Sequence, residues 1–271
     1  MSDGSIAAKM IGERLWFYTN YHCNLACRYC LTSSSPASPK RELDAALMLD
    51  LVAEAKVLGF RAVGITGGEP FMRADMPEVV AAVARHLPVV VLTNGTLFTE
   101  RFVTRLAPLG ALPAALQVSL DSADAATNDA LRGRGTHARV LAGIRRLRAA
   151  GIHVRIGSTV AAGSADLQPL CELHRRLGIP DADHVNRPVV RRGRADDNGL
   201  GIVARLEDLP AELTLTAEGA FWSPASPTVR ADRLEIGELL TRTIAPLSIP
   251  LTAMLRYAAN GGVPPATGLV A

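Results

Sequence analysis

The sequence lacks several features that would place the protein in a specialised class. No apolar run reaches the roughly 18 residues that a membrane-spanning helix needs, and the first residues lack the charged-then-apolar layout of a secretory signal peptide. Aromatic residues make up only 4% of the chain, and no run of Lys and Arg is interleaved with them, although the net charge is +3. These absences predict a cytoplasmic protein with no membrane or nucleic-acid partner.

Cysteine is also scarce, and its distribution is uneven. Four cysteines in 271 residues are too few for a disulfide framework, and three of them crowd within eight positions, 23–30. In a reducing compartment such crowding indicates a metal or a metal cluster. Hydrophobic residues at 48% and charged residues at 20% supply ordinary material for one large α/β domain.

What the sequence does contain is a regular alternation of β-type and helical segments from residue 14 to about 190. The six predicted strands are ERLWFYTN, RAVGITGG, PVVVLTNG, AALQVSLDS, HVRIGSTV and ADHVNRPVV. The segments between them have helical spacing, and in the first we expect Leu47, Leu51 and Leu58 to share one buried face. Six strand–helix units predict an α/β fold, a partial (β/α)6 parallel TIM-like barrel, although composition alone would also allow a doubly wound sheet.

The barrel is expected to be followed by a short C-terminal extension. We divide the sequence into an N-terminal tail, the barrel and the extension, at 1–13, 14–195 and 196–271. In the extension, LTLTAEGAFW predicts a hairpin that turns near Glu218. Two short helices are predicted to follow it, around 232–242 and 250–259.

The three clustered cysteines form the most specific motif. YHCNLACRYC places Cys23, Cys27 and Cys30 in a C-x3-C-x2-C arrangement directly after the first strand. Thiolates hold [4Fe–4S] clusters, and three of them leave one iron with an open position, as in catalytic metal sites. The carboxyl ends of barrel strands are also where barrel enzymes carry out their chemistry. The alternative is a zinc knot completed by His22 or Cys171, but the sequence has no second matching pair of ligands.

Three further motifs lie at predicted strand ends, ITGGEP at 65–70, LTNGT at 92–96 and VSLDS at 118–122. The two glycines of the first let a ligand approach the backbone, and the Glu69 carboxylate can take a cationic partner. Ser119 and Asp121 lie two apart on a strand, so a hydroxyl and a carboxylate share one face and suit a sugar diol. A tight turn at 67–70 and an N-cap role for Asp121 are the alternatives.

These motifs, with Tyr29 directly before the third cysteine, resemble the radical S-adenosylmethionine (SAM) superfamily over residues 14–195. The resemblance implies that the cysteines hold one [4Fe–4S] cluster, whose open iron chelates SAM and whose electron breaks the S–C5′ bond. The 5′-deoxyadenosyl radical then abstracts hydrogen from a substrate, and an electron donor such as flavodoxin or ferredoxin is implied. The residues implied to line the SAM site are Tyr29, Gly67, Gly68, Glu69, Pro70, Thr93, Asn94, Ser119 and Asp121.

The segment DALRGRGTHARVLAGIRRL, residues 129–147, resembles one branch of that superfamily. This branch contains molybdenum-cofactor cyclases, sulfatase-maturing enzymes and peptide modifiers, and it favours a peptide or a small biosynthetic intermediate as substrate. Cofactor assembly of the tetrapyrrole or quinone type remains an alternative, and so does a non-catalytic iron–sulfur electron carrier. Arg132 and Arg155 are candidates for binding the SAM carboxylate, with a solvated surface charge as the alternative for each.

Many members of that branch carry a cysteine-rich extension with auxiliary clusters. Here no cysteine follows Cys171, so residues 172–271 supply no thiolate for one. We therefore predict an extension without an auxiliary cluster, which caps the barrel mouth and in which Phe221 and Trp222 pack rather than touch substrate. Cys171 lies in a leucine-rich helix and is predicted to be a small buried residue rather than a hydrogen donor.

Overall fold

The computed structural model describes residues 11–160, 167–230 and 233–260. All six predicted strands are present, as β1 Arg14–Tyr18, β2 Ala62–Thr66, β3 Val89–Thr93, β4 Ala114–Ser119, β5 His153–Val160 and β6 His184–Pro188. Each pairs in parallel with the next along the chain. The predicted partial parallel barrel is therefore confirmed, and a doubly wound order is excluded because the strand order never reverses.

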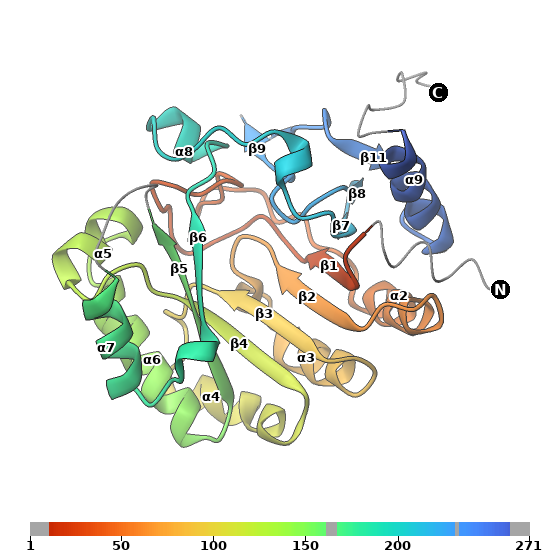
Figure 1. The fold of residues 1–271 in the computed structure, drawn as a ribbon. Helices are drawn as coiled ribbons and strands as arrows, with labels where there is room; N and C mark the ends of the chain where they lie inside the picture. The colour runs from red at the N-terminus through yellow and green to blue at the C-terminus, as the bar shows by residue number, and fades with distance from the viewer. Residues whose placement is uncertain (1–10, 161–166, 231–232, 261–271) are drawn as a thin grey trace.

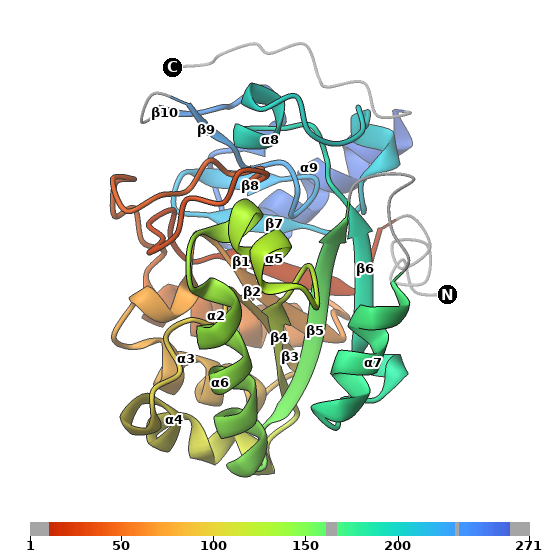
Figure 2. The ribbon, with the colours of Figure 1, turned by 90° about the vertical axis from the view of Figure 1, so that its left-hand side faces the viewer.

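Helices cover the outer face of this curved sheet (Figures 1 and 2). They are α2 Ala45–Val57, α3 Met76–Ala84, α4 Glu100–Leu106, α5 Ala125–Arg132, α6 Thr136–Ala149 and α7 Gln168–Arg176. Three begin with a side-chain cap, in which Asp44, Thr99 and Asp124 accept hydrogen bonds from backbone N–H groups of the first turn. Among the described residues, no helix is long and apolar enough to cross a bilayer.

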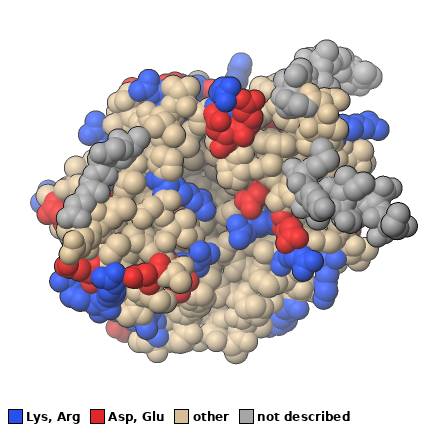
Figure 3. All heavy atoms as spheres, in the orientation of Figure 1, with Lys and Arg blue, Asp and Glu red and all other residues tan. Residues whose placement is uncertain are grey.

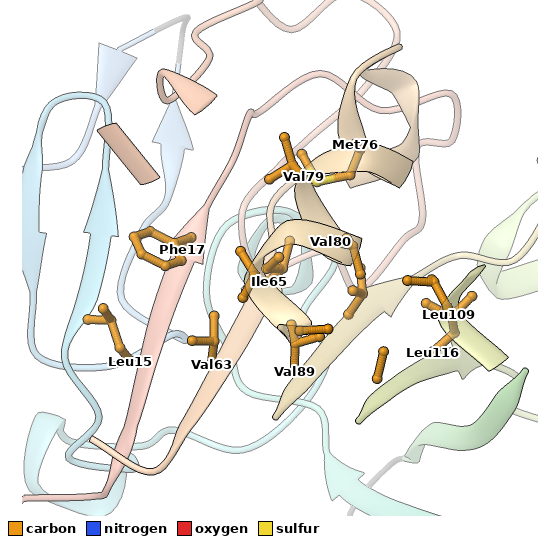
Figure 4. Close-up of a cluster of buried hydrophobic side chains, with 14 of the residues drawn as sticks. Leu15, Phe17, Val63, Ile65, Met76, Val79, Val80, Val89, Leu109 and Leu116 are labelled. Atoms are coloured by element: carbon orange, nitrogen blue, oxygen red, sulfur yellow. The ribbon is translucent and has the colours of Figure 1, made fainter. Parts of the chain in front are cut away.

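The main core lies between the sheet and these helices. Alternate residues of a strand face opposite ways, and Leu15, Phe17, Val63 and Ile65 point from β1 and β2 into the apolar cluster that includes Val80 of α3 (Figure 4). The residues between them point the other way, toward the barrel interior. The same alternation thus builds the core and lines the cavity described below.

The helix face predicted for α2 is partly wrong. Leu51 is buried together with Met48, Val52 and Ala55, but Leu58 is 41% exposed and Leu47 is only half-buried. Leu58 lies one residue beyond the last turn of α2, where the chain turns away from the helix axis toward β2. The spacing of Leu58 continues the helical period of α2, but α2 ends before this residue.

The C-terminal extension continues the barrel sheet instead of forming a separate layer. Its strand β7, Thr214–Thr216, pairs in parallel with β1, and β8, Gly219–Phe221, forms the antiparallel partner of β7. Trp222 follows β8 and packs on Tyr257, with ring centroids 5.1 Å apart, and Phe221 is fully buried. Both aromatic side chains therefore pack in the extension, as the sequence predicted.

The prediction of a helix at 232–242 is wrong for the described residues 233–242. The described part of that segment holds the strands β10, Arg233–Leu234, and β11, Leu239–Thr241, and β11 pairs antiparallel with β8. Pairing to a free sheet edge overrides local propensity in a segment this short. The second predicted helix forms as α9, Ser248–Ala259, which buries Met254 and Tyr257.

Candidate active site

A cavity of about 520 Å³ lies inside the barrel toward the carboxyl ends of its strands. Every barrel strand contributes to its lining, and so does the extension through Pro224 and Ala225. The predicted site residues that line it are Cys23, Cys27, Tyr29, Cys30, Gly67, Gly68, Thr93, Asn94 and Ser119. Residues far apart in the chain are thus brought together by the parallel strand order.

The three cysteines stand in the loop after β1 as free thiols, and all three face the cavity. Cys23 is the most buried, and its Sγ accepts hydrogen bonds from the backbone N–H of Leu25 (3.4 Å) and from the Asn94 side-chain amide (3.7 Å). Such donors stabilise a thiolate bound to iron. Burial raises the pKa of Cys23 to about 12 and also raises the pKa of Cys27, so iron binding releases protons from both.

The donor set fits an iron–sulfur cluster better than zinc. A zinc knot needs its ligands to converge on one ion, but among the described residues no three Cys, His, Asp or Glu side chains do so. In a cubane each cysteine binds a different iron, so its three thiolates stand apart around the cluster. His22, the proposed fourth zinc ligand, has its Nδ1 3.2 Å from the carbonyl of Ser38.

Arg194 holds the cysteine loop in place, a role that the sequence did not reveal. Its guanidinium donates to the carbonyl oxygens of Cys27, Ser33 and Ser34, each at 2.9 Å, and its backbone N–H donates to that of Cys30 at 3.0 Å. Gly193 permits the contact, because a Cβ there would lie 2.3 Å from the Leu31 carbonyl oxygen. The only local signal was the Gly-Arg pair at 193–194.

The glycines of the ITGGEP motif bring two loops of the protein itself together. A Cβ on Gly68 would lie 2.3 Å from the His22 carbonyl oxygen, and one on Gly67 2.5 Å from the Asn20 carbonyl oxygen. Gly67 also has φ +149°, a conformation that disfavours other residues. Both glycines are therefore needed for the close approach of the cysteine loop. They also line the cavity.

Glu69 lies behind the cavity wall, not on it. Its fully buried carboxylate accepts hydrogen bonds from the N–H of Phe71 (3.1 Å), the Thr93 hydroxyl (2.8 Å) and the N–H of Asn94 (2.7 Å). Burial raises the pKa of Glu69 to about 7 despite these donors. Pro70 is likewise buried, as the first residue of a short 3₁₀ turn.

Asp121 is engaged in a buried polar cluster and does not share the cavity with Ser119. Its Oδ2 accepts from the Tyr29 hydroxyl (2.5 Å) and from Arg132 (3.2 Å), while Oδ1 accepts from the N–H of Thr159 (2.9 Å). β4 ends at Ser119, so the alternation that would place both side chains on one face does not extend to residue 121. The alternative N-cap role for Asp121 is also wrong, because Asp124 caps α5.

The two candidate arginines are in different places. Arg132 lines the cavity beside Tyr29 while paired with Asp121. Arg155 lies near the start of β5, and its guanidinium faces Asp183 at 3.5 Å. Only Arg132 therefore stands where the resemblance implied a SAM contact.

Comparison with known proteins agrees with this geometry. The model of the radical SAM superfamily matches residues 18–164. The chain belongs to the radical SAM superfamily. It is 40% identical over 161 residues to the mycofactocin maturase MftC of Mycobacterium tuberculosis, covering 58% of this chain and 40% of that protein. It is 35% identical over 179 residues to the AdoMet-dependent heme synthase of Methanosarcina barkeri, covering 65% of this chain and 50% of that one.

Among solved structures, the fold is similar to that of Streptococcus suis SuiB, determined with S-adenosylmethionine and with its precursor peptide SuiA. The TM-score is 0.56 and the identity 19% in both, covering 66% and 69% of this chain and 41% and 42% of SuiB. This likeness is one of fold alone, and it agrees with the partial parallel barrel. The chain spans half or less of the length of these proteins.

The resemblance implies that the Glu69 carboxylate attracts the SAM ammonium, here from behind the cavity wall, and its raised pKa then predicts a pH-dependent affinity for SAM. Glu69 is ionised above about pH 7 and neutral below it, and only the ionised form would attract an ammonium group. At one unit below the pKa about a tenth of the carboxylate is charged, so we expect roughly ten-fold weaker SAM binding at pH 6 than at pH 8. Spectral titration of the reconstituted protein measures both constants. Glu69→Gln should bind weakly at both pH values, whereas equal wild-type affinities would remove Glu69 from SAM recognition.

Cys171 differs in part from its prediction. It is half-buried, not fully buried, and its Sγ lies 3.7 Å from Nδ1 of His184. The thiol stands in the helix layer and does not line the cavity. The apolar face of α7 is formed by Leu170 and Leu173.

We therefore expect Cys171→Ser to leave SAM cleavage and product formation largely intact. The expected cost is about 1 kcal/mol of unfolding free energy, from altered packing. A thermal melt measures the stability, and chromatography measures 5′-deoxyadenosine and product. Normal SAM cleavage with an abortive product would instead identify Cys171 as a hydrogen donor.

Proposed function

We propose that the chain uses one [4Fe–4S] cluster to cleave SAM reductively and to abstract hydrogen from a substrate. The observation that carries the proposal is three free thiols on one wall of a barrel cavity, beside Gly67, Gly68, Thr93, Asn94 and Ser119. When bound, the cluster supplies the open iron site and the electron for breaking the S–C5′ bond of SAM. The chain's own part is to hold the thiols, position SAM and shield the cavity.

A peptide is the favoured substrate. MftC is called a maturase and SuiB was determined with a precursor peptide, which supports this choice. The similarity to an AdoMet-dependent heme synthase supports a second candidate substrate, a tetrapyrrole or another cofactor intermediate. A flavodoxin or ferredoxin in the cytoplasm is the proposed electron source.

A non-catalytic electron carrier is less well supported. Such a cluster needs a fourth protein ligand, and the sequence offers one further thiol, Cys171. That thiol contacts His184 outside the cavity lining. A carrier would also leave the cavity beside the three thiols without a use.

Anaerobic reconstitution tests the proposal. We expect about four irons and four sulfides per chain, brown absorbance that changes when SAM is added, and 5′-deoxyadenosine after reduction by dithionite. A brown protein that is indifferent to SAM would support the electron carrier, and a colourless zinc protein would support the zinc knot. A count near eight irons would reveal a second cluster.

A further inference from the structure

Gln117 places an amide group inside the barrel cavity. It lies in β4 between Leu116 and Val118, which pack in the core outside the barrel, so alternation along the strand points Gln117 the other way. The side chain is only 7% exposed, and it lines the cavity. In the described parts of the chain its amide has no hydrogen-bond partner. Amides this well buried are normally paired, so this one is free to receive a ligand.

A glycine on the neighbouring strand makes the room in which this amide lies. In the parallel pair of β4 and β5, Gly157 is the partner of Ser119, two residues beyond Gln117. A Cβ on Gly157 would lie 2.9 Å from Nε2 of Gln117 and 3.3 Å from its Cγ. The amide therefore occupies space that a larger residue at 157 would fill, and it lies across β5 toward the level of Ser119.

Gln117 lies deeper in the barrel than the residues implied to bind SAM. Ser119 is two residues further along the same strand, which places it about 6–7 Å nearer the carboxyl ends of the strands and the cysteine loop. The cavity reaches the level of Gln117, because it is also lined by Trp16 and by Leu92, the partner of Gln117 on β3. SAM bound at the strand ends would leave this deeper space to the substrate.

The charges of the cavity favour neither an anion nor a cation. Its lining contains two guanidinium groups, of Arg132 and Arg187, and two carboxylates, of Asp208 and Glu212. The face of the molecule seen in Figure 1 is hollowed near its centre, and both basic and acidic side chains lie near that hollow (Figure 3). An uncharged group with a donor and an acceptor is therefore the ligand that best suits the Gln117 amide, which offers one of each.

We propose that Gln117 binds the backbone of an extended peptide substrate inside the barrel. The inference rests on the proposed function and selects the peptide from its two candidate substrates. In an extended chain the N–H and C=O groups of one residue point to the same side, as in a hydrogen-bonded pair of antiparallel strands. Oε1 of Gln117 accepts from that N–H, and Nε2 donates to that C=O. The two bonds hold one substrate residue below SAM, whatever its side chain.

The test measures peptide binding to the reconstituted full chain, saturated with SAM, by titration calorimetry. The parent probe is an N-acetylated tripeptide of leucine, alanine and leucine with a C-terminal N-methylamide. In three analogues an ester oxygen replaces one backbone N–H of the tripeptide at a time. One analogue should bind about five-fold or more weakly than the parent, because Oε1 of Gln117 then faces an oxygen and not a donor. The position of that ester identifies the residue that Gln117 holds.

Variants assign this sensitivity to Gln117. Gln117→Leu should bind the parent and all three esters with about equal affinity, and it should bind SAM as the wild type does. Its melting temperature should equal or exceed that of the wild type, because the substitution removes no hydrogen bond within the protein. Gln168→Leu is the matched control. Gln168 is the chain's other glutamine and lies exposed at the start of α7, so this variant should keep the wild-type affinities.

Four results would overturn the inference. The wild type binds no parent peptide up to about 10 mM, or binds the esters as well as the parent, or the sensitivity to one ester survives Gln117→Leu. The fourth is weaker SAM binding by Gln117→Leu with the ester sensitivity unchanged, which would assign Gln117 to the adenine of SAM, whose edge also offers a donor beside an acceptor. A lower melting temperature of Gln117→Leu would show a structural role instead. Failure of the proposed function shows separately, as a reduced wild-type protein that forms no 5′-deoxyadenosine.

Discussion

Replacing Cys23, Cys27 or Cys30 singly with alanine is expected to abolish 5′-deoxyadenosine formation by the reconstituted protein. All three thiols face one cavity, and two thiolates are too few to hold a cubane firmly while SAM occupies its remaining iron. Iron content should fall with the activity. Both are measured on the same anaerobic sample, by a colorimetric iron assay and by chromatography of the reduced reaction.

The matched control is Cys171→Ala, which removes a thiol outside the cavity and should retain both iron and SAM cleavage. If any one of the three loop variants formed 5′-deoxyadenosine at the wild-type rate, the assignment of the cluster would fail. Loss of activity with full iron content would point instead to a fault in SAM binding.

Asp121→Ala is expected to produce the largest loss of stability among single substitutions at the site. The Asp121 and Arg132 side chains are only 1% and 4% exposed, and the substitution leaves a buried guanidinium without its carboxylate. Breaking a buried pair in this way costs about 3–5 kcal/mol. In a protein of this size the melting temperature should fall by roughly 10 °C, measured by circular dichroism on the apoprotein.

Two controls separate this effect from the loss of any charge. Asp181→Ala removes the carboxylate of the exposed pair with Arg175, whose side chains are 63% and 57% exposed, and should cost less than about 1 kcal/mol. The double substitution Asp121→Leu with Arg132→Met should recover much of the loss, because it removes both buried charges. A melting temperature within two degrees of wild type for Asp121→Ala would contradict the buried pair.

The sequence by itself determined the strands and the chemistry of the loop. Most barrel strands are rich in Val, Ile, Leu or Thr, and Cys23, Cys27 and Cys30 are close enough in the chain for their spacing to be read directly. These features are local, so neighbouring residues carry the signal. Thr93, Asn94 and Ser119 could be placed near the thiols because parallel strands end at one edge.

Tertiary structure alone decided the contacts that depend on the path of distant segments. Arg194 reaches the loop from 167 positions away along the chain, and Arg132 meets Asp121 because a turn carries that carboxylate past the end of β4. The segment around 239–241 became a strand because β8 presented a free edge. Periodicity in the sequence shows which face of a helix or strand is apolar, but it does not show which other element packs against that face. The hydrogen bonds between distant segments depend on that packing partner.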